Sequence, residues 1–326
     1  MSLDSDLIVD RRRIRRKLTF WRVLAAIIAI AAIAVIGMIV SPSGRGAFSS
    51  AGSIARINIE GLIRSDQERV EALERLEKSK AAAVVVHINS PGGTTAGSEQ
   101  LFDSLMRLKQ KKPLVVVVEG LAASGGYITA IAADHIVAQQ SSLVGSIGVL
   151  FQYPNFTELL KTVGVKVEEV KSSPLKAAPN GFEPTSPEAR EALDSLVKDS
   201  YAWFKGLVKD RRGMDDAQLE KISDGRVFTG RQAVDLKLVD ELGDEKAAVA
   251  WLVAQKNVQK DLPVRDYQLA PRFGDLTFLR AAASITLDAL GLSGIARQVE
   301  QMGMTQAVNR LGLDGMLALW QPAGSN

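Results

Sequence analysis

The run Leu-Val-Val-Val-Val at residues 114–118 constrains the fold of this chain more than any other feature. A short run of consecutive β-branched residues is typical of a strand that is buried on both faces of a parallel sheet. A second apolar run covers residues 81–88, and a helical pattern follows it at residues 95–111. This alternation predicts an α/β domain whose sheet is covered by helices on both faces.

The flanking sequence continues the same alternation. Further strands are predicted at residues 54–59, 135–138 and 166–170, and further helices at 67–80, 187–212, 215–222 and 246–257. The helix at 187–212 has Ser186 at its expected N-cap and Pro187 at its first position, where both residue types are favoured. Residues 171–187 contain four prolines and show no period, which predicts an ordered loop or a mobile arm.

Ser124 lies between the strand at 114–118 and a small-residue helix at 128–133, in the sequence Gly120-Leu-Ala-Ala-Ser-Gly-Gly-Tyr127. Glycines on both sides leave the serine hydroxyl accessible and leave backbone N–H groups free around it. Nucleophilic acyl transfer needs both features. The alternative interpretation is that Ser124 only caps the helix that follows.

A second glycine turn, Asn-Ser-Pro-Gly-Gly at residues 89–93, follows the strand at 81–88. Loops at the carboxyl ends of parallel strands converge, so this turn is expected beside Ser124. Gly92 and Gly93 allow this turn to expose a backbone N–H, and one such donor together with the N–H of Gly125, aimed at one point next to Ser124, would form an oxyanion hole. Taken alone the turn is an ordinary one, and the pair of turns is what favours catalysis.

The base is not evident from residue type. The chain has two histidines, of which His87 lies in a buried strand and His135 begins a strand 11 residues after Ser124. Both are interpreted as core or edge residues. A lysine can replace histidine when burial lowers the lysine pKa.

Composition excludes several other classes. The chain has no cysteine, so it forms no disulfide, no thiolate zinc site and no cysteine nucleophile. Residues 1–22 hold seven basic and three acidic residues, while the remainder has 33 basic and 34 acidic ones. The body of the chain therefore carries no basic patch for nucleic acid. It also has no Gly-x4-Gly-Lys-Ser/Thr loop, and we expect no nucleotide, metal or cofactor.

The N-terminal residues predict a membrane anchor. A basic tail at residues 1–17 precedes residues 23–40, which contain no charge. Eighteen such residues can cross a bilayer, and Trp21 lies where an interfacial aromatic is expected. We expect a transmembrane signal-anchor helix at residues 18–40, with the N-terminus in the cytoplasm and the rest outside. The alternative is a cleavable signal peptide, whose apolar core is usually about 7–15 residues long.

The remaining boundaries follow from composition. Residues 41–53 are rich in Gly and Ser and predict a flexible tether, and residues 54–258 carry the α/β pattern. Residues 259–275 lose their period and form a linker. Residues 276–326 predict a helical extension that packs on the core, on a partner subunit or on the membrane, although few basic residues favour the membrane.

Four motifs in this order resemble one peptidase family; they lie at residues 89–93, 120–127, 144–149 and 230–240. Together they are similar to signal peptide peptidase A of the short, single-repeat bacterial type, in the Clp-protease/crotonase fold group. The resemblance covers residues 54–258. It implies an α/β fold with a repeated ββα spiral core and a peptidase that uses a serine–lysine dyad.

The resemblance also implies residue roles. Ser124 matches the nucleophile, and Lys176 matches the lysine that serves as general base. Gly93 and Gly125 match the oxyanion-hole donors, and Ser146 matches a position that orients the lysine.

One segment departs from the family pattern. The loop at residues 171–176 has Ser173 and Pro174 where the family has a Gly-x pair. The choice between Lys171 and Lys176 as the base therefore stays open at this point.

The implied function is hydrolysis of cleaved signal peptides and other extended apolar peptides, through an acyl-enzyme, at the outer face of a bacterial cytoplasmic membrane. Family members form homo-oligomeric rings or domes, and whether the lysine acts on the serine of its own subunit or of a neighbour stays open at this point. Three alternatives remain. They are a peptidase of the same fold that cuts a stomatin-like membrane-scaffold partner, a crotonase-type acyl-CoA enzyme, and a non-catalytic membrane scaffold.

Overall fold

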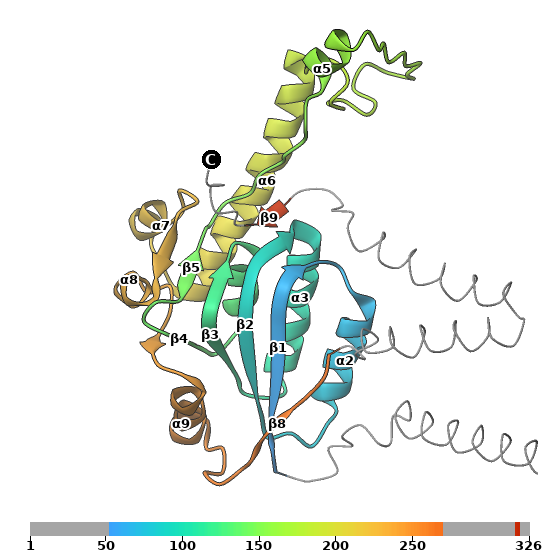
Figure 1. Ribbon diagram of the computed structural model, residues 1–326. Coiled ribbons are helices and arrows are strands. Elements are labelled where there is room, and N and C mark those ends of the chain that lie inside the picture. Colours follow the sequence, from blue (N-terminus) through green and yellow to red (C-terminus); the bar gives the residue numbers. More distant parts are fainter. Residues whose placement is uncertain (1–51, 270–316, 320–326) are drawn as a thin grey trace, which may run out of the picture. The chain divides into compact units, whose positions relative to one another are not determined.

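The computed structural model describes residues 52–269 and 317–319 of the chain (Figure 1). The strands are β1 (Ile54–Ile63), β2 (Ala83–Thr94), β3 (Leu114–Ala123), β4 (His135–Ala138), β5 (Leu143–Gly145), β6 (Val227–Thr229), β7 (Glu241–Leu242), β8 (Val264–Asp266) and β9 (Leu317–Leu319). The helices are α2 (Gln67–Glu77), α3 (Thr95–Lys109), α4 (Gly125–Ala130), α5 (Thr157–Thr162), α6 (Pro187–Arg212), α7 (Asp216–Ile222), α8 (Gly230–Asp235) and α9 (Glu245–Lys256).

The described strands form one mixed sheet whose central members are β2 and β3. The main path of the sheet is β6-β5-β3-β2-β1-β8. β1, β2 and β3 run parallel, as the apolar runs predict. β5 and β6 pair antiparallel, and so do β2 and β9, so the sheet is not wholly parallel.

β3 connects two parts of the sheet because its halves have different partners on the same side. Its first half, from Val115 to Val118, pairs with β4, and its last residues, Leu121 to Ala123, pair with β5. The sheet therefore splays at the carboxyl end of β3. This is the point at which the chain turns into α4.

Helices cover both faces of the sheet. On one face α9 contributes Ala248 and Leu252 to a buried cluster with Val85, Val115 and Val117 from the central strands. Helices α2, α3 and α4 lie on the opposite face (Figure 1). The fully buried residues of β2 and β3 thus explain the absence of polar alternation in their sequences.

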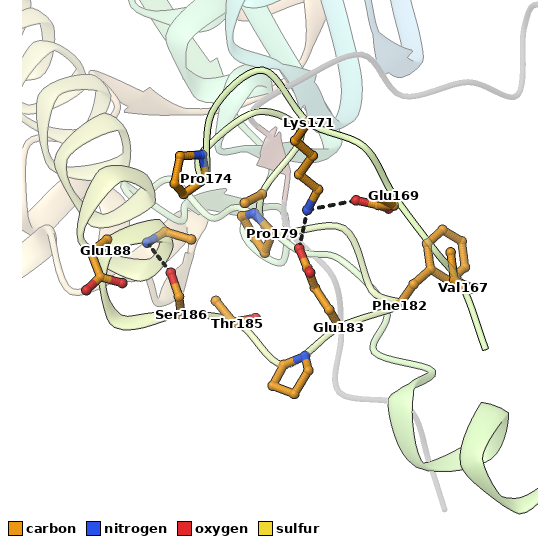
Figure 2. A pocket seen from close by; sticks show the side chains of 13 residues that line it. Val167, Glu169, Lys171, Pro174, Pro179, Phe182, Glu183, Thr185, Ser186 and Glu188 are labelled. Carbon is orange, nitrogen blue, oxygen red and sulfur yellow. Dashed lines mark hydrogen bonds and ion pairs between the residues drawn. The ribbon is translucent and has the colours of Figure 1, made fainter.

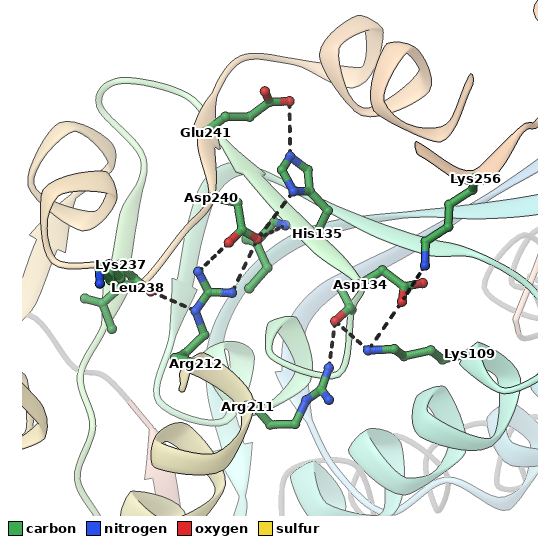
Figure 3. A network of polar contacts seen from close by, with 12 residues as sticks. Lys109, Asp134, His135, Arg211, Arg212, Lys237, Leu238, Asp240, Glu241 and Lys256 are labelled. Carbon is green, nitrogen blue, oxygen red and sulfur yellow. Dashed lines mark hydrogen bonds and ion pairs between the residues drawn. The ribbon is translucent and has the colours of Figure 1, made fainter. Parts of the chain in front are cut away.

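The C-terminal end of α4 is anchored by basic side chains from two other helices (Figure 3). Arg211 donates to the carbonyl oxygens of Ile131 and Ala133 at 2.7 and 2.8 Å, and Lys109 donates to Ala133 at 3.0 Å. A helix leaves such carbonyls without a partner at its C-terminus. Burial lowers the pKa of Lys109, but Asp134 lies 3.5 Å away and favours the charged amine. These contacts fix the C-terminal end of α4, and through this short helix they restrain its first residue, Gly125.

α6 begins and ends as its sequence predicts. The Ser186 hydroxyl accepts a hydrogen bond from the N–H of Ala189, and Pro187 occupies the first turn. Gly213 ends the helix in the left-handed conformation that favours glycine.

Three predictions need correction. Residues 264–266 lie within the predicted linker at 259–275 but form β8, which pairs with β1. Residues 166–170 form no strand, because no described neighbour pairs with them and Val170 is fully exposed. Residues 317–319 lie within the predicted helical extension but form β9. The predicted tail at 1–17, the anchor at 18–40 and the rest of the extension lie outside the described residues. Within residues 52–269 and 317–319, no helix combines the length and apolar character needed to cross a bilayer.

Candidate active site

Ser124 occupies a sharp turn between β3 and α4, in a backbone conformation that glycine favours. Its φ is 53° and its ψ is −116°, close to the first central residue of a type II′ turn. Such a conformation in a residue with a side chain stores about 1–3 kcal/mol of strain. The side chain makes no capping hydrogen bond to α4. Ser124 therefore occupies the N-cap position of α4 without the side-chain hydrogen bond that a capping serine makes.

The two glycine turns lie side by side. A Cβ added to Gly126 would lie 2.6 Å from the carbonyl oxygen of Ser90, and one added to Gly120 would lie 3.0 Å from Oδ1 of Asn89. The structure thus confirms the predicted convergence of these two segments. One detail of the prediction is wrong. Residues 89–93 do not form a separate turn but continue β2, with a register shift after Ile88.

The predicted oxyanion-hole residues, Gly93 and Gly125, lie in the two segments that converge beside Ser124. Gly125 begins α4, so its N–H has no acceptor within that helix. The Ser90 hydroxyl accepts from the N–H of Gly92 at 3.1 Å and donates to the Gly61 carbonyl at 2.7 Å. Ser90 thereby satisfies the N–H of Gly92, and the next residue of β2, Gly93, lies opposite Ile63 of β1 and Ala318 of β9.

Gly93 is expected to tolerate no side chain. A Cβ at this position would lie 1.8 Å from the Ile63 carbonyl oxygen, so Gly93→Ala has to push β1 and β2 apart. We expect an unfolding free energy lower by about 3 kcal/mol, at the upper end of overpacking effects, measured as a lower thermal midpoint. Gly206→Ala is the control, because nothing lies within 4 Å of its added Cβ. Equal midpoints for the two variants would contradict this packing.

Ser146 lies beside Ser124 through its neighbour Gly145. The N–H of Ser124 donates to the Gly145 carbonyl at 2.8 Å, and the N–H of Ser146 donates to the Arg226 carbonyl at 2.8 Å. Ser146 is 7% exposed and has a φ of 51°. The Ser124 hydroxyl lies 3.4 Å from the Gly148 carbonyl, a long and weak contact.

Lys176 is not close to Ser124 within one chain. It lies on the arm, defined as residues 151–186, which projects from the outer end of α6 (Figure 1). A hollow beside Ser146 is also lined by Val197 and Tyr201 of α6. The first ten residues of α6, 187–196, extend about 15 Å beyond this hollow, and the arm begins at their far end. Lys176 is exposed, and its side-chain amine has no hydrogen-bond or ion-pair partner among the described residues.

Lys171, the other candidate base, is held as a cation. Its amine contacts Glu169 at 2.7 Å and forms an ion pair with Glu183. These hydrogen bonds raise the pKa of Lys171. A general base has to lose its proton, so this environment favours Lys176 over Lys171.

A hollow of about 360 Å³ lies next to Ser146, and sequence analysis did not identify its lining. It is bounded by residues 146–150 on one side and by Val197, Lys198 and Tyr201 of α6 on the other. The helical period of α6 predicts which residues face inward, but not that this face meets the loop after β5.

The two histidines have structural partners. The ring nitrogens of His87 lie 2.7 and 2.8 Å from Glu119 and Glu245, and His135 stacks on Trp251 at 4.6 Å. Neither contacts Ser124. Within the described chain no group of three or more His, Asp or Glu side chains is arranged to hold a metal ion.

Comparison with protein-family models and known proteins gives consistent matches. Residues 106–259 match the model of peptidase family S49, and residues 57–142 match that of Clp protease. "Putative protease slr0021" of Synechocystis sp. is 35% identical over 215 residues, which cover 65% of this chain and 78% of that protein. Protease 4 of Haemophilus influenzae is 30% identical, over 66% of this chain and 37% of its own length.

Solved structures are more distant. The 1510-N membrane-bound stomatin-specific protease has a TM-score of 0.44 and 16% identity, over 68% of this chain and 99% of that one. ClpP1 from Listeria monocytogenes has a TM-score of 0.36 and 18% identity, over 58% of this chain and 91% of its own.

Proposed function

Because the chain belongs to peptidase family S49, with a Clp-protease-like α/β fold, we propose that it is a serine endopeptidase that cleaves extended apolar peptides, including cleaved signal peptides. The observation that carries the proposal is the conformation of Ser124. Its hydroxyl caps no helix, and the free N–H of Gly125 lies next to it. A strained serine beside the N–H of Gly125 fits a nucleophile better than a structural role.

The proposed chemistry uses a serine–lysine dyad. Neutral Lys176 accepts the hydroxyl proton as Ser124 Oγ bonds to the peptide carbonyl carbon. The N–H groups of Gly93 and Gly125 stabilise the oxyanion, and each such donor typically lowers the barrier by about 2.7–4 kcal/mol. The C–N bond then breaks, and the lysine returns the proton to the leaving amine. A water deprotonated by the same lysine hydrolyses the ester. Ser146 orients the lysine amine.

A second copy of the chain brings Lys176 to Ser124 in this proposal. The described chain has twelve large apolar side chains that are exposed to solvent, and ten of them lie between residues 151 and 196. Such a concentration on a projecting arm is typical of an interaction surface. Burial of the arm against a neighbour covers these side chains. It also removes Lys176 from water, which favours its neutral form.

The proposed location follows from the N-terminal segment. Residues 18–40 anchor the chain in a bacterial cytoplasmic membrane, the tail at 1–17 lies in the cytoplasm, and the peptidase domain at 54–258 lies outside. Tethered copies share one plane, which favours a closed homo-oligomeric ring or dome.

The edge of β2 supports binding by strand addition. β9 pairs antiparallel with this edge opposite Gly92, Gly93 and Thr94. An extended substrate can pair with the same backbone groups, which bring its carbonyl to the Gly93 N–H.

A substrate on this edge has to compete with β9. A tethered segment competes at an effective concentration of about a millimolar, so ending the chain at residue 316 is expected to raise kcat/KM for a peptide several-fold. A chain that ends at residue 323 keeps β9 and is the control. The measurement is steady-state hydrolysis of a fluorogenic peptide. Equal kcat/KM for the two truncated proteins would show that β9 does not compete.

A substrate panel tests the proposed function. The purified full-length chain in detergent is incubated with signal peptides, with stomatin tail peptides and with acyl-CoA thioesters, and products are identified by mass spectrometry. We expect cleavage of signal peptides and covalent labelling of Ser124 by a fluorophosphonate. Preference for stomatin tails supports the first alternative, and turnover of acyl-CoA alone supports the crotonase-type enzyme. No turnover and no labelling indicate a scaffold.

A further inference from the structure

Four side chains join the two limbs of the loop that carries Lys176. Lys171 contacts Glu169 at 2.7 Å and pairs with Glu183 (Figure 2). Asn180 donates to Glu169 at 2.9 Å and to Glu183 at 3.2 Å. We name these four residues the arm clasp. Its members come from residues 169–171 on the outgoing limb and 180–183 on the returning one.

Lys176 lies between these limbs. Its N–H donates to the Ser173 carbonyl at 3.1 Å, and Ala177 next to it has a φ of 59°. The direction of the lysine side chain is thus set by a short turn whose two ends meet at the arm clasp.

The loop has no filled core that could hold this shape instead. A hollow of about 430 Å³ lies beneath it, with Val167, Pro174, Pro179 and Phe182 in its walls. The side chain of Lys171 is 17% exposed, in contrast to 66% for Lys161 in its ion pair on α5 of the same arm. Lys171 therefore lies inside the loop, bridging the limbs, and not on its surface.

We propose that the arm clasp positions Lys176 for catalysis, with Lys171 as the cation that joins both limbs. This inference rests on the proposed function, because it needs Lys176 to be the base. Lys171 is a positioning residue that touches neither substrate nor Ser124. The departure of residues 173–174 from the family pattern lies within the loop that the clasp closes.

The clasp needs a fixed positive charge but not an amine. A guanidinium presents a planar set of donors that can bridge two carboxylates, so arginine can replace lysine in this role. Arginine cannot serve as a general base, because it does not lose its proton. The substitution Lys171→Arg therefore separates positioning from base catalysis.

The test compares variants of the full-length chain in hydrolysis of a fluorogenic peptide. We expect Lys171→Met to lower kcat at least tenfold with KM within twofold, and Lys171→Arg to retain at least half of the parent kcat. Glu183→Gln, a milder change, lowers kcat in the same direction. Lys161→Met breaks the ion pair with Glu158 at 2.7 Å and should leave both constants unchanged.

The pH–rate profile gives a second readout. Lys171→Met leaves the carboxylates of Glu169 and Glu183 uncompensated in the loop that carries Lys176, which favours the protonated form of the base, so the acid limb moves to higher pH. Lys171→Arg leaves the limb in place. Parent kcat in Lys171→Met would overturn the proposal. So would inactive Lys171→Arg together with active Lys176→Arg, which would identify Lys171 as the base. Parent activity in Ser124→Ala would instead refute the proposed function itself.

Discussion

The Ser124→Ala protein is expected to hydrolyse peptides up to about 10⁶-fold more slowly than the parent chain, the factor that loss of the serine nucleophile costs in a serine protease. The change removes the attacking oxygen but retains the backbone conformation, with its φ of 53°. The oxyanion-hole amides of Gly93 and Gly125 stay in place, so KM should change little. The measurement is kcat and KM for a peptide substrate, with titration of active sites by a fluorophosphonate.

Ser104→Ala is the matched control, because its hydroxyl donates only to the Gln100 carbonyl of its own helix, at 2.8 Å, and accepts from Arg107. That variant should retain parent kcat. Ser124→Gly should be inactive and also more stable than the parent, because glycine adopts the turn conformation without strain. Parent activity in Ser124→Ala would exclude Ser124 as the nucleophile.

The parts of the fold that depend on neighbouring residues in sequence could be predicted. The N-cap at Ser186 and the strand at residues 135–138 agree with the structure, since capping and apolar runs are local signals. The extension of β2 through Pro91 and Gly93 could not be predicted from a Pro-Gly-Gly sequence. It depends on β1, which lies opposite those residues as far as Ile63.

The site shows the same division. The convergence of residues 89–93 with Ser124 follows from strand order, which the pattern of apolar runs predicts. The projection of the arm could not be predicted from the sequence, because it depends on how far α6 extends beyond the sheet. The β-branched Val167 and Val170 suggest a strand, but no described strand lies beside them to pair with. The contact of Lys171 with Glu183 joins residues 12 apart across a loop without a period.

Two inactive variants are expected to restore activity when they are assembled together. If the arm acts on a neighbouring copy, Lys176→Ala supplies an intact Ser124, and Ser124→Ala supplies an intact Lys176. In a ring with head-to-tail contacts and random mixing, about a quarter of the sites then combine both groups. Each variant alone should show less than about 1% of parent activity, because acyl transfer needs both the nucleophile and its base.

The experiment coexpresses the two variants with different affinity tags, isolates complexes that carry both tags, and measures peptide hydrolysis per site. A parallel complex of Ser124→Ala with the double variant Ser124→Ala/Lys176→Ala has no nucleophile and should stay inactive. Restoration in the first complex alone requires that Lys176 of one copy reaches Ser124 of another. Inactivity in both would show that each arm folds back onto its own chain. That movement would have to span the distance, about 15 Å, by which α6 extends beyond the hollow at Ser146.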